Sequence, residues 1–104
     1  LLYISISIVQ IDGNLVVESV LNNFALQLDL FGAIIVNGGS LNIDSSDFTI
    51  FGMLQINFGY TGISGGTLDV IGGSTIEINS DATVDITGTP FTLFSGSSCT
   101  VQGS

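Results

Sequence analysis

The sequence predicts an all-β fold, namely a three-sided, right-handed parallel β-solenoid of about four turns with about 26 residues per turn. Three observations support this prediction. Short segments alternate polar and apolar residues, which is the period of a half-buried strand. Clusters of turn-forming residues separate these segments. A Gly-led phrase recurs along the chain, and such a long repeat is typical of solenoids.

Length and composition predict a single domain over residues 1–104 with a packed core. Apolar residues make up 45% of the 104 residues, which argues against disorder despite the one-signed charge. Ile and Val are abundant along the whole chain, and both favour strands.

The long repeat is marked by four leucines, each in a similar phrase. Leu15, Leu41, Leu68 and Leu93 follow one another at intervals of about 26 residues, as the members of a solenoid repeat do. In a parallel solenoid, equivalent residues of successive coils stack about 4.8 Å apart. We therefore expect these leucines to form one internal ladder, and Phe24 and Phe48 to form another.

A shorter repeat lies inside the long one in the second half of the chain. Threonine-led strands begin at 67, 75, 83, 92 and 100, so that three of them make up one turn. Their alternation predicts which side chains point inward. The inward set is Leu68, Val70, Ile76, Ile78, Val84 and Ile86, and the outward set is Thr67, Asp69, Thr75, Glu77, Thr83 and Asp85. Residues 24–36 keep this repeat poorly, and their sides stay unassigned.

An antiparallel β-sandwich is the alternative fold, since it also uses short strands with frequent turns. A sandwich does not require the long recurrence of the Gly-led phrase, so the solenoid is preferred. The right-handed winding is expected because crossovers between parallel strands are overwhelmingly right-handed.

The charge pattern excludes several function classes. The chain has nine acidic residues and no Lys, Arg or His, so it lacks the basic surface that nucleic acid or anionic lipid requires. It also lacks the commonest general base and metal ligand. No segment approaches the roughly 18 apolar residues of a membrane helix. The single Cys99 cannot form an internal disulfide.

Chemical motifs in the sequence are weak, and we expect no enzyme activity, catalytic residue or cofactor. Residues 62–66 match the G-x-S-x-G spelling of a nucleophile elbow, but that motif needs a His partner. Asp69, Glu77 and Asp85 are expected on three different faces, where they cannot form an acid pair. Asp44 and Asp47 are weak calcium candidates, because turns favour such residues without any metal.

The two ends of the repeat suggest how the chain assembles. Residues 2–9 alternate strictly and resemble one solenoid side, within an N-terminal strand of residues 1–12, while residues 13–104 form the repeat turns and close with two sides. We expect the last turn of each subunit to be completed by residues 2–11 of the next subunit, in a head-to-tail polymer that rises about 19 Å per subunit. The expected interface is Ile4, Ile6 and Ile8 at one end and Leu93, Cys99 and Val101 at the other. The chain begins with Leu, so it is expected to be a processed form or a piece of a longer solenoid.

Residues 65–88, GGTLDVIGGSTIEINSDATVDITG, resemble the rungs of extracellular β-solenoid proteins. These include bacterial adhesins, autotransporter-like passengers, and surface filament or sheath proteins. The resemblance implies a secreted, non-catalytic structural protein that stacks into an extracellular filament, with cations as counterions. The alternative function is an adhesin-type module that binds surfaces or glycans.

Overall fold

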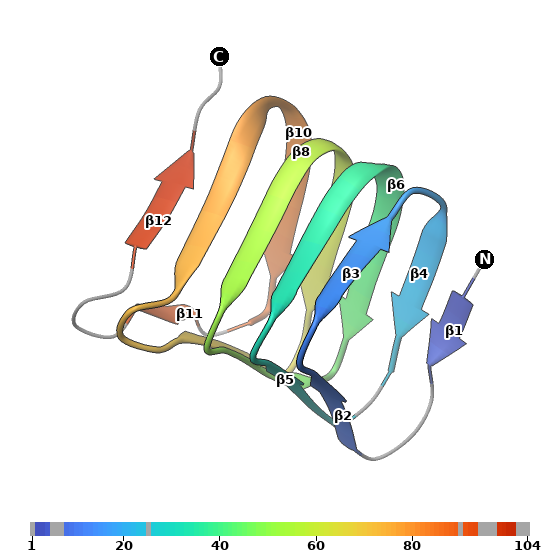
Figure 1. The fold of residues 1–104 in the computed structure, drawn as a ribbon. Coiled ribbons are helices and arrows are strands. Elements are labelled where there is room, and N and C mark those ends of the chain that lie inside the picture. Colours follow the sequence, from blue (N-terminus) through green and yellow to red (C-terminus); the bar gives the residue numbers. More distant parts are fainter. Residues whose placement is uncertain (1, 5–7, 25, 90, 94–97, 102–104) are drawn as a thin grey trace.

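The fold is all-β, as the alternating pattern predicts. The computed structural model describes residues 2–4, 8–24, 26–89, 91–93 and 98–101 (Figure 1). Within these residues the strands are β1 (Leu2–Ile4), β2 (Ile8–Ile11), β3 (Asn14–Val17), β4 (Val20–Asn23), β5 (Gln27–Leu30), β6 (Ala33–Asp44), β7 (Asp47–Ile50), β8 (Met53–Ser64), β9 (Thr67–Val70), β10 (Thr75–Thr87), β11 (Phe91–Leu93) and β12 (Ser98–Val101).

The strands form two parallel sheets. The first has the order β1-β4-β6-β8-β10-β12, with β3 also paired to β6, and the second has the order β11-β9-β7-β5-β2. Every pairing between the described strands is parallel. This arrangement confirms the β-solenoid and excludes the antiparallel sandwich. The right-handed winding and the three-sided cross-section stay predictions.

Each coil contributes three strand segments. In the first complete coil these are β2, β3 and β4, whereas the second and third segments merge into the long, bent strands β6, β8 and β10 of the later coils (Figure 1). Four complete turns result, as predicted. β1 is the third segment of an incomplete turn at the N-terminal end. β11 and β12 are the first and second segments of an incomplete turn at the C-terminal end.

The core lies inside the coils and consists of stacked aliphatic and aromatic side chains. Along the first segment the stack runs Val9, Leu28, Phe48, Leu68 and Phe91. Leu28, Phe48 and Leu68 are at most 2% exposed. Burial of such apolar surface at about 25 cal/mol per Å² is the main stabilising contribution. The predicted inward set over residues 68–86 is confirmed by this register and burial.

The predicted 26-residue turn is wrong, because the register gives shorter coils. Equivalent positions of neighbouring coils, such as Asp47 and Thr67, are 20 residues apart. The next step, from Leu68 to Phe91, is longer. The extra length arises because four residues, 71–74, replace the two-residue corner of residues 51–52, and because β10 has a register shift after Ile78.

The two predicted ladders are wrong for the same reason. Leu15 stacks on Ile34, Leu41 lies between Leu21 and Thr61, and Leu68 stacks on Phe48. Leu93 pairs with Val70, two residues away from the Leu68 position. Phe24 is 39% exposed, whereas Phe48 is fully buried. The four leucines therefore occupy different columns.

Close stacking of the coils requires glycine at the corners. The Met53 amide donates to the Gly32 carbonyl at 3.0 Å, and the Thr75 amide donates to the Gly52 carbonyl at 3.0 Å. A Cβ atom on Gly52 would overlap the carbonyl oxygen of Gly32. The absent side chain therefore allows backbone to approach backbone at this corner.

An amide ladder follows the bend between the second and third segments. The Asn79 side chain donates to the Asn57 side chain at 2.7 Å, and Asn57 donates in turn to Asn37 at 2.8 Å. Gln55 also donates to Asn57, at 2.9 Å. These bonds join three successive coils at a place where the strands shift register.

In the described segments we find no helix with the length and apolar character that crossing a membrane requires.

Candidate functional site at the two ends of the solenoid

The C-terminal end presents an open sheet edge over an incompletely covered core. Within the described residues, no strand pairs with Ala82–Thr87 on the side away from β8. Ile86 is 37% exposed and Phe91 is 40% exposed, whereas the equivalent Ile63 and Leu68 one coil earlier are 2% and 0% exposed. Unpaired backbone above partly exposed apolar side chains is a surface suited to strand addition.

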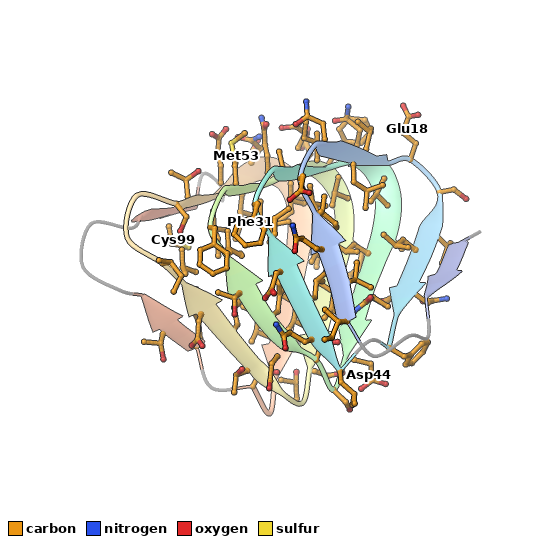
Figure 2. All side chains as sticks on the ribbon, turned by 60° about the horizontal axis from the view of Figure 1, so that its bottom comes forward. Glu18, Phe31, Asp44, Met53 and Cys99 are labelled. Carbon is orange, nitrogen blue, oxygen red and sulfur yellow. The ribbon has the colours of Figure 1, made fainter. Side chains whose placement is uncertain are left out.

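The N-terminal end is open in a complementary way. Val9, Ile11 and Leu15 point into the solenoid but are only partly buried, because they belong to the first complete coil. A hollow of about 290 Å³ opens at the bend between β3 and β4, with Leu15 and Leu21 among its lining residues. Glu18, which also lines this hollow, lies at the opposite end of the molecule from Cys99 (Figure 2).

The two ends are matched in their layout. Each segment position is occupied by five described strands, namely β2, β5, β7, β9 and β11 in the first, β3, β6, β8, β10 and β12 in the second, and β1, β4, β6, β8 and β10 in the third. The N-terminal end carries an extra third segment, β1. The C-terminal end carries extra first and second segments, β11 and β12, with the third position open above Ala82–Thr87.

The three residues predicted for the N-terminal interface do not lie on one side of the solenoid. The alternation predicts one continuous side over residues 2–9, but the structure assigns β1 and β2 to different sheets. Ile4 stands in register with the buried Asn23, Ile8 is 60% exposed on the outer face, and Ile6 lies outside the described residues. Because the chain passes from one side to another between β1 and β2, the inward residues of β2 are Val9 and Ile11.

At the other end, the predicted residues all lie on the last coil. Leu93 pairs with Val70, Cys99 with Ile76, and Val101 with Ile78. Cys99 is a half-buried thiol, and its burial raises its pKa above the ordinary value. The Cys99 thiol is therefore largely protonated at neutral pH.

The calcium candidates Asp44 and Asp47 each have a local partner. Asp44 accepts a hydrogen bond from the Ser45 hydroxyl at 3.0 Å, and Asp47 accepts one from Thr67 at 3.2 Å. Asp44 projects from its corner away from the interior (Figure 2). In the part of the chain that the structure describes, no group of three or more His, Cys, Asp or Glu side chains converges to hold a metal. A calcium site stays a prediction.

The other residues singled out for chemistry are dispersed. Asp69 lies on β9, while Glu77 and Asp85 lie on the two halves of β10. Ser64, the serine of the elbow-like motif, ends β8 before a glycine corner rather than a helix. The sequence contains no His to act as its base. The structure therefore places these residues in separate strand segments and does not give Ser64 the strand-to-helix turn of a nucleophile elbow.

The described strands form a parallel β-solenoid with an unpaired sheet edge at each end. Comparison with protein-family models, curated proteins and solved structures gives no match for this chain.

Proposed function

We propose that this protein is a non-catalytic structural subunit that stacks head to tail into an extracellular filament. The observation that carries the proposal is the complementary layout of the two ends. When a second copy is placed above the first, its β1 fills the open third position on β10, while its β2 and β3 lie on β11 and β12. Such a contact is heterologous and does not close, so it generates fibres rather than rings.

The register within one subunit supports a specific pairing at the proposed junction. Continuing the columns places Leu2, Tyr3 and Ile4 of the next subunit beside Val84, Asp85 and Ile86. The same continuation places Val9 of the next subunit beside Phe91, and Leu15 beside Cys99. The partly exposed apolar side chains of both ends then cover one another, which supplies the driving force.

The incomplete turns at the two ends change the expected rise of the filament. Each column holds five strands, because β1, β11 and β12 add one strand to each column of the four complete turns. Each subunit therefore advances the fibre by about 24 Å, since neighbouring strands are about 4.8 Å apart, rather than by the about 19 Å of four turns alone.

The remaining features agree with an extracellular polymer, and this location is part of the proposal. The chain resembles the rungs of secreted adhesins, autotransporter-like passengers and sheath proteins. It also contains no Lys or Arg, so trypsin-like proteases find no cleavage site. The nine carboxylates per subunit would bind cations as counterions.

Electron microscopy of the purified protein tests the proposal. We expect unbranched fibres with an axial rise of about 24 Å and a strong spacing of about 4.8 Å along the axis. Discrete particles at all protein concentrations, or a rise that is not a multiple of the strand spacing, would overturn it. A folded monomer that binds surfaces or glycans without polymerising would favour the adhesin-type alternative.

A further inference from the structure

A shallow hollow of about 250 Å³ lies on the outer face of the third segments and reaches the C-terminal edge strand β10. Three coils supply most of its lining, through the second halves of β6, β8 and β10, and Phe24 adds a side chain from the first coil. The lining residues that bear on binding are Asn42, Asp44, Tyr60, Gly62 and Asp85.

The hollow exists because Gly62 stands at its centre. The register aligns Asn42, Gly62 and Asp85 across three coils, and Asp44, Ser64 and Thr87 beside them. A Cβ atom on Gly62 would lie 2.7 Å from the Tyr60 hydroxyl oxygen and 2.9 Å from its Cε2 atom. The aromatic ring of Tyr60 therefore lies across Gly62, in space that any other residue would fill.

The Tyr60 hydroxyl interacts with a carboxylate of the next coil. Hydrogen bonding to Asp85 is the main cause that raises the pKa of Tyr60 above its ordinary value, followed by desolvation and the negative charge of Asp85. Tyr60 therefore stays protonated at physiological pH and offers an apolar ring at the edge of the hollow. On the opposite side, Asn42 is fixed by donating to Asn22 at 2.9 Å.

The rim is rich in hydrogen-bond acceptors and poor in features that would bind an ion. Asp44 and Asp85 lie on β6 and β10 with β8 between them, and they are two residue positions out of register. In the described part of the chain they belong to no group of three or more His, Cys, Asp or Glu side chains that could hold a metal ion. The net charge of −9 disfavours an anionic ligand. A neutral ligand with many hydroxyl donors and an apolar face fits best.

We propose that this hollow binds a neutral carbohydrate, with one hexose ring against Tyr60. The ring's C–H face packs on the aromatic side chain, and its hydroxyls donate to Asp44, Asp85 and the Asn42 carbonyl oxygen. The volume is below the range of about 300–1,000 Å³ for drug-sized ligands, so it accommodates a single ring of a longer chain. If the subunits polymerise as proposed, the site recurs along one side of the fibre.

Titration of neutral oligosaccharides of glucose, mannose and galactose, followed by NMR or calorimetry, tests this site. We expect at least one of them to bind with a dissociation constant near the millimolar range. Tyr60→Ala should weaken this binding at least tenfold, and Gly62→Ser should do the same because its side chain would displace the Tyr60 ring. Thr49→Ala, on the outer face of β7 in the other sheet, is the control and should bind like the original protein.

Fold and assembly are measured on the same variants by thermal unfolding and electron microscopy. The site is overturned if no oligosaccharide of the panel binds at millimolar concentration, or if folded Tyr60→Ala binds as tightly as the original protein. Either result leaves fibre formation unaffected, so the failure of this site and the failure of the filament are distinguishable.

Discussion

Thr61 is one of the buried polar residues at which the interior of the solenoid departs from apolar stacking. It lies between Leu41 and Val84 in the third segment and is fully buried. Among the described residues, its hydroxyl oxygen has no hydrogen-bond partner. A buried hydroxyl without a partner carries an uncompensated desolvation cost.

Thr61→Val should therefore stabilise the protein. The substitution removes the hydroxyl and leaves a β-branched side chain in a strand, so we expect a gain of about 1 kcal/mol in the free energy of unfolding. Denaturant unfolding of the variant measures this gain. Thr49→Val, on a half-buried outer position, should change stability by less than about 0.5 kcal/mol, and a loss of stability in Thr61→Val would show that the hydroxyl is satisfied.

The corner glycines allow a second prediction at the residue scale. Gly52→Ala should destabilise the fold by about 1–3 kcal/mol, the usual cost of overpacking, because the new methyl group meets the Gly32 carbonyl oxygen. Gly13→Ala is the matched control, since a Cβ at that corner of the first coil has no neighbour within 4 Å. Thermal unfolding of the two variants should separate them, and equal midpoints would contradict the close stacking of the corners.

At the scale of the strand, β10 carries the open edge. Ile86→Asp should abolish assembly, because the junction would bury a carboxylate without a partner. The same change should cost the monomer little, since the side chain is already 37% exposed. Thr87→Asp, the next residue on the outer face, should still assemble. Light scattering and circular dichroism measure both properties, and fibres formed by Ile86→Asp would exclude this edge from the interface.

Strand positions are partly predictable from sequence. The alternation over residues 67–86 identifies the inward side chains, because strand periodicity is local. The turn length is harder to recognise, because the phrases led by Gly13, Gly39 and Gly66 do not begin equivalent segments. They begin a second, a third and a first segment, respectively. The spacing between two phrases is therefore the length of one turn plus one side. The true period shows in Phe31-Gly32 and Phe51-Gly52, whose rings stack at 4.5 Å.

The site residues are less predictable than the strands. The open ends follow from counting sides, but the passage from β1 to β2 reverses which residues of the first strands point inward. The hollow around Gly62 cannot be recognised without the register, because Asn42, Tyr60 and Asp85 come from three coils. Chemistry that depends on stacking between coils is invisible in any one segment.

At the scale of the whole molecule, the net charge should control the proposed assembly. Nine acidic residues per subunit correspond to one negative charge per about 2.7 Å of a fibre that rises about 24 Å per subunit. Subunits therefore repel one another at low salt. Raising ionic strength from about 0.01 M to about 0.15 M shortens the screening length from about 30 Å to about 8 Å and should promote both fibre growth and lateral bundling. Sedimentation across a salt series measures this, and weaker assembly at higher salt would contradict it.

The central claim is that one subunit continues the coils of the next in register. In a single subunit Leu15 and Cys99 are separated by four coil spacings, or about 19 Å. At the proposed junction they are neighbours about 4.8 Å apart, within the Cα separation of about 4.4–6.8 Å that a disulfide spans.

Oxidation of the Leu15→Cys variant, analysed on a non-reducing gel, tests this claim most directly. The account predicts a ladder of covalent dimers, trimers and longer chains that reduction collapses to monomer, whereas Val16→Cys, on the outer face, should give far less. A Leu15→Cys protein that forms fibres but does not cross-link would contradict the register, and one that remains monomeric under all assembly conditions would contradict the filament itself.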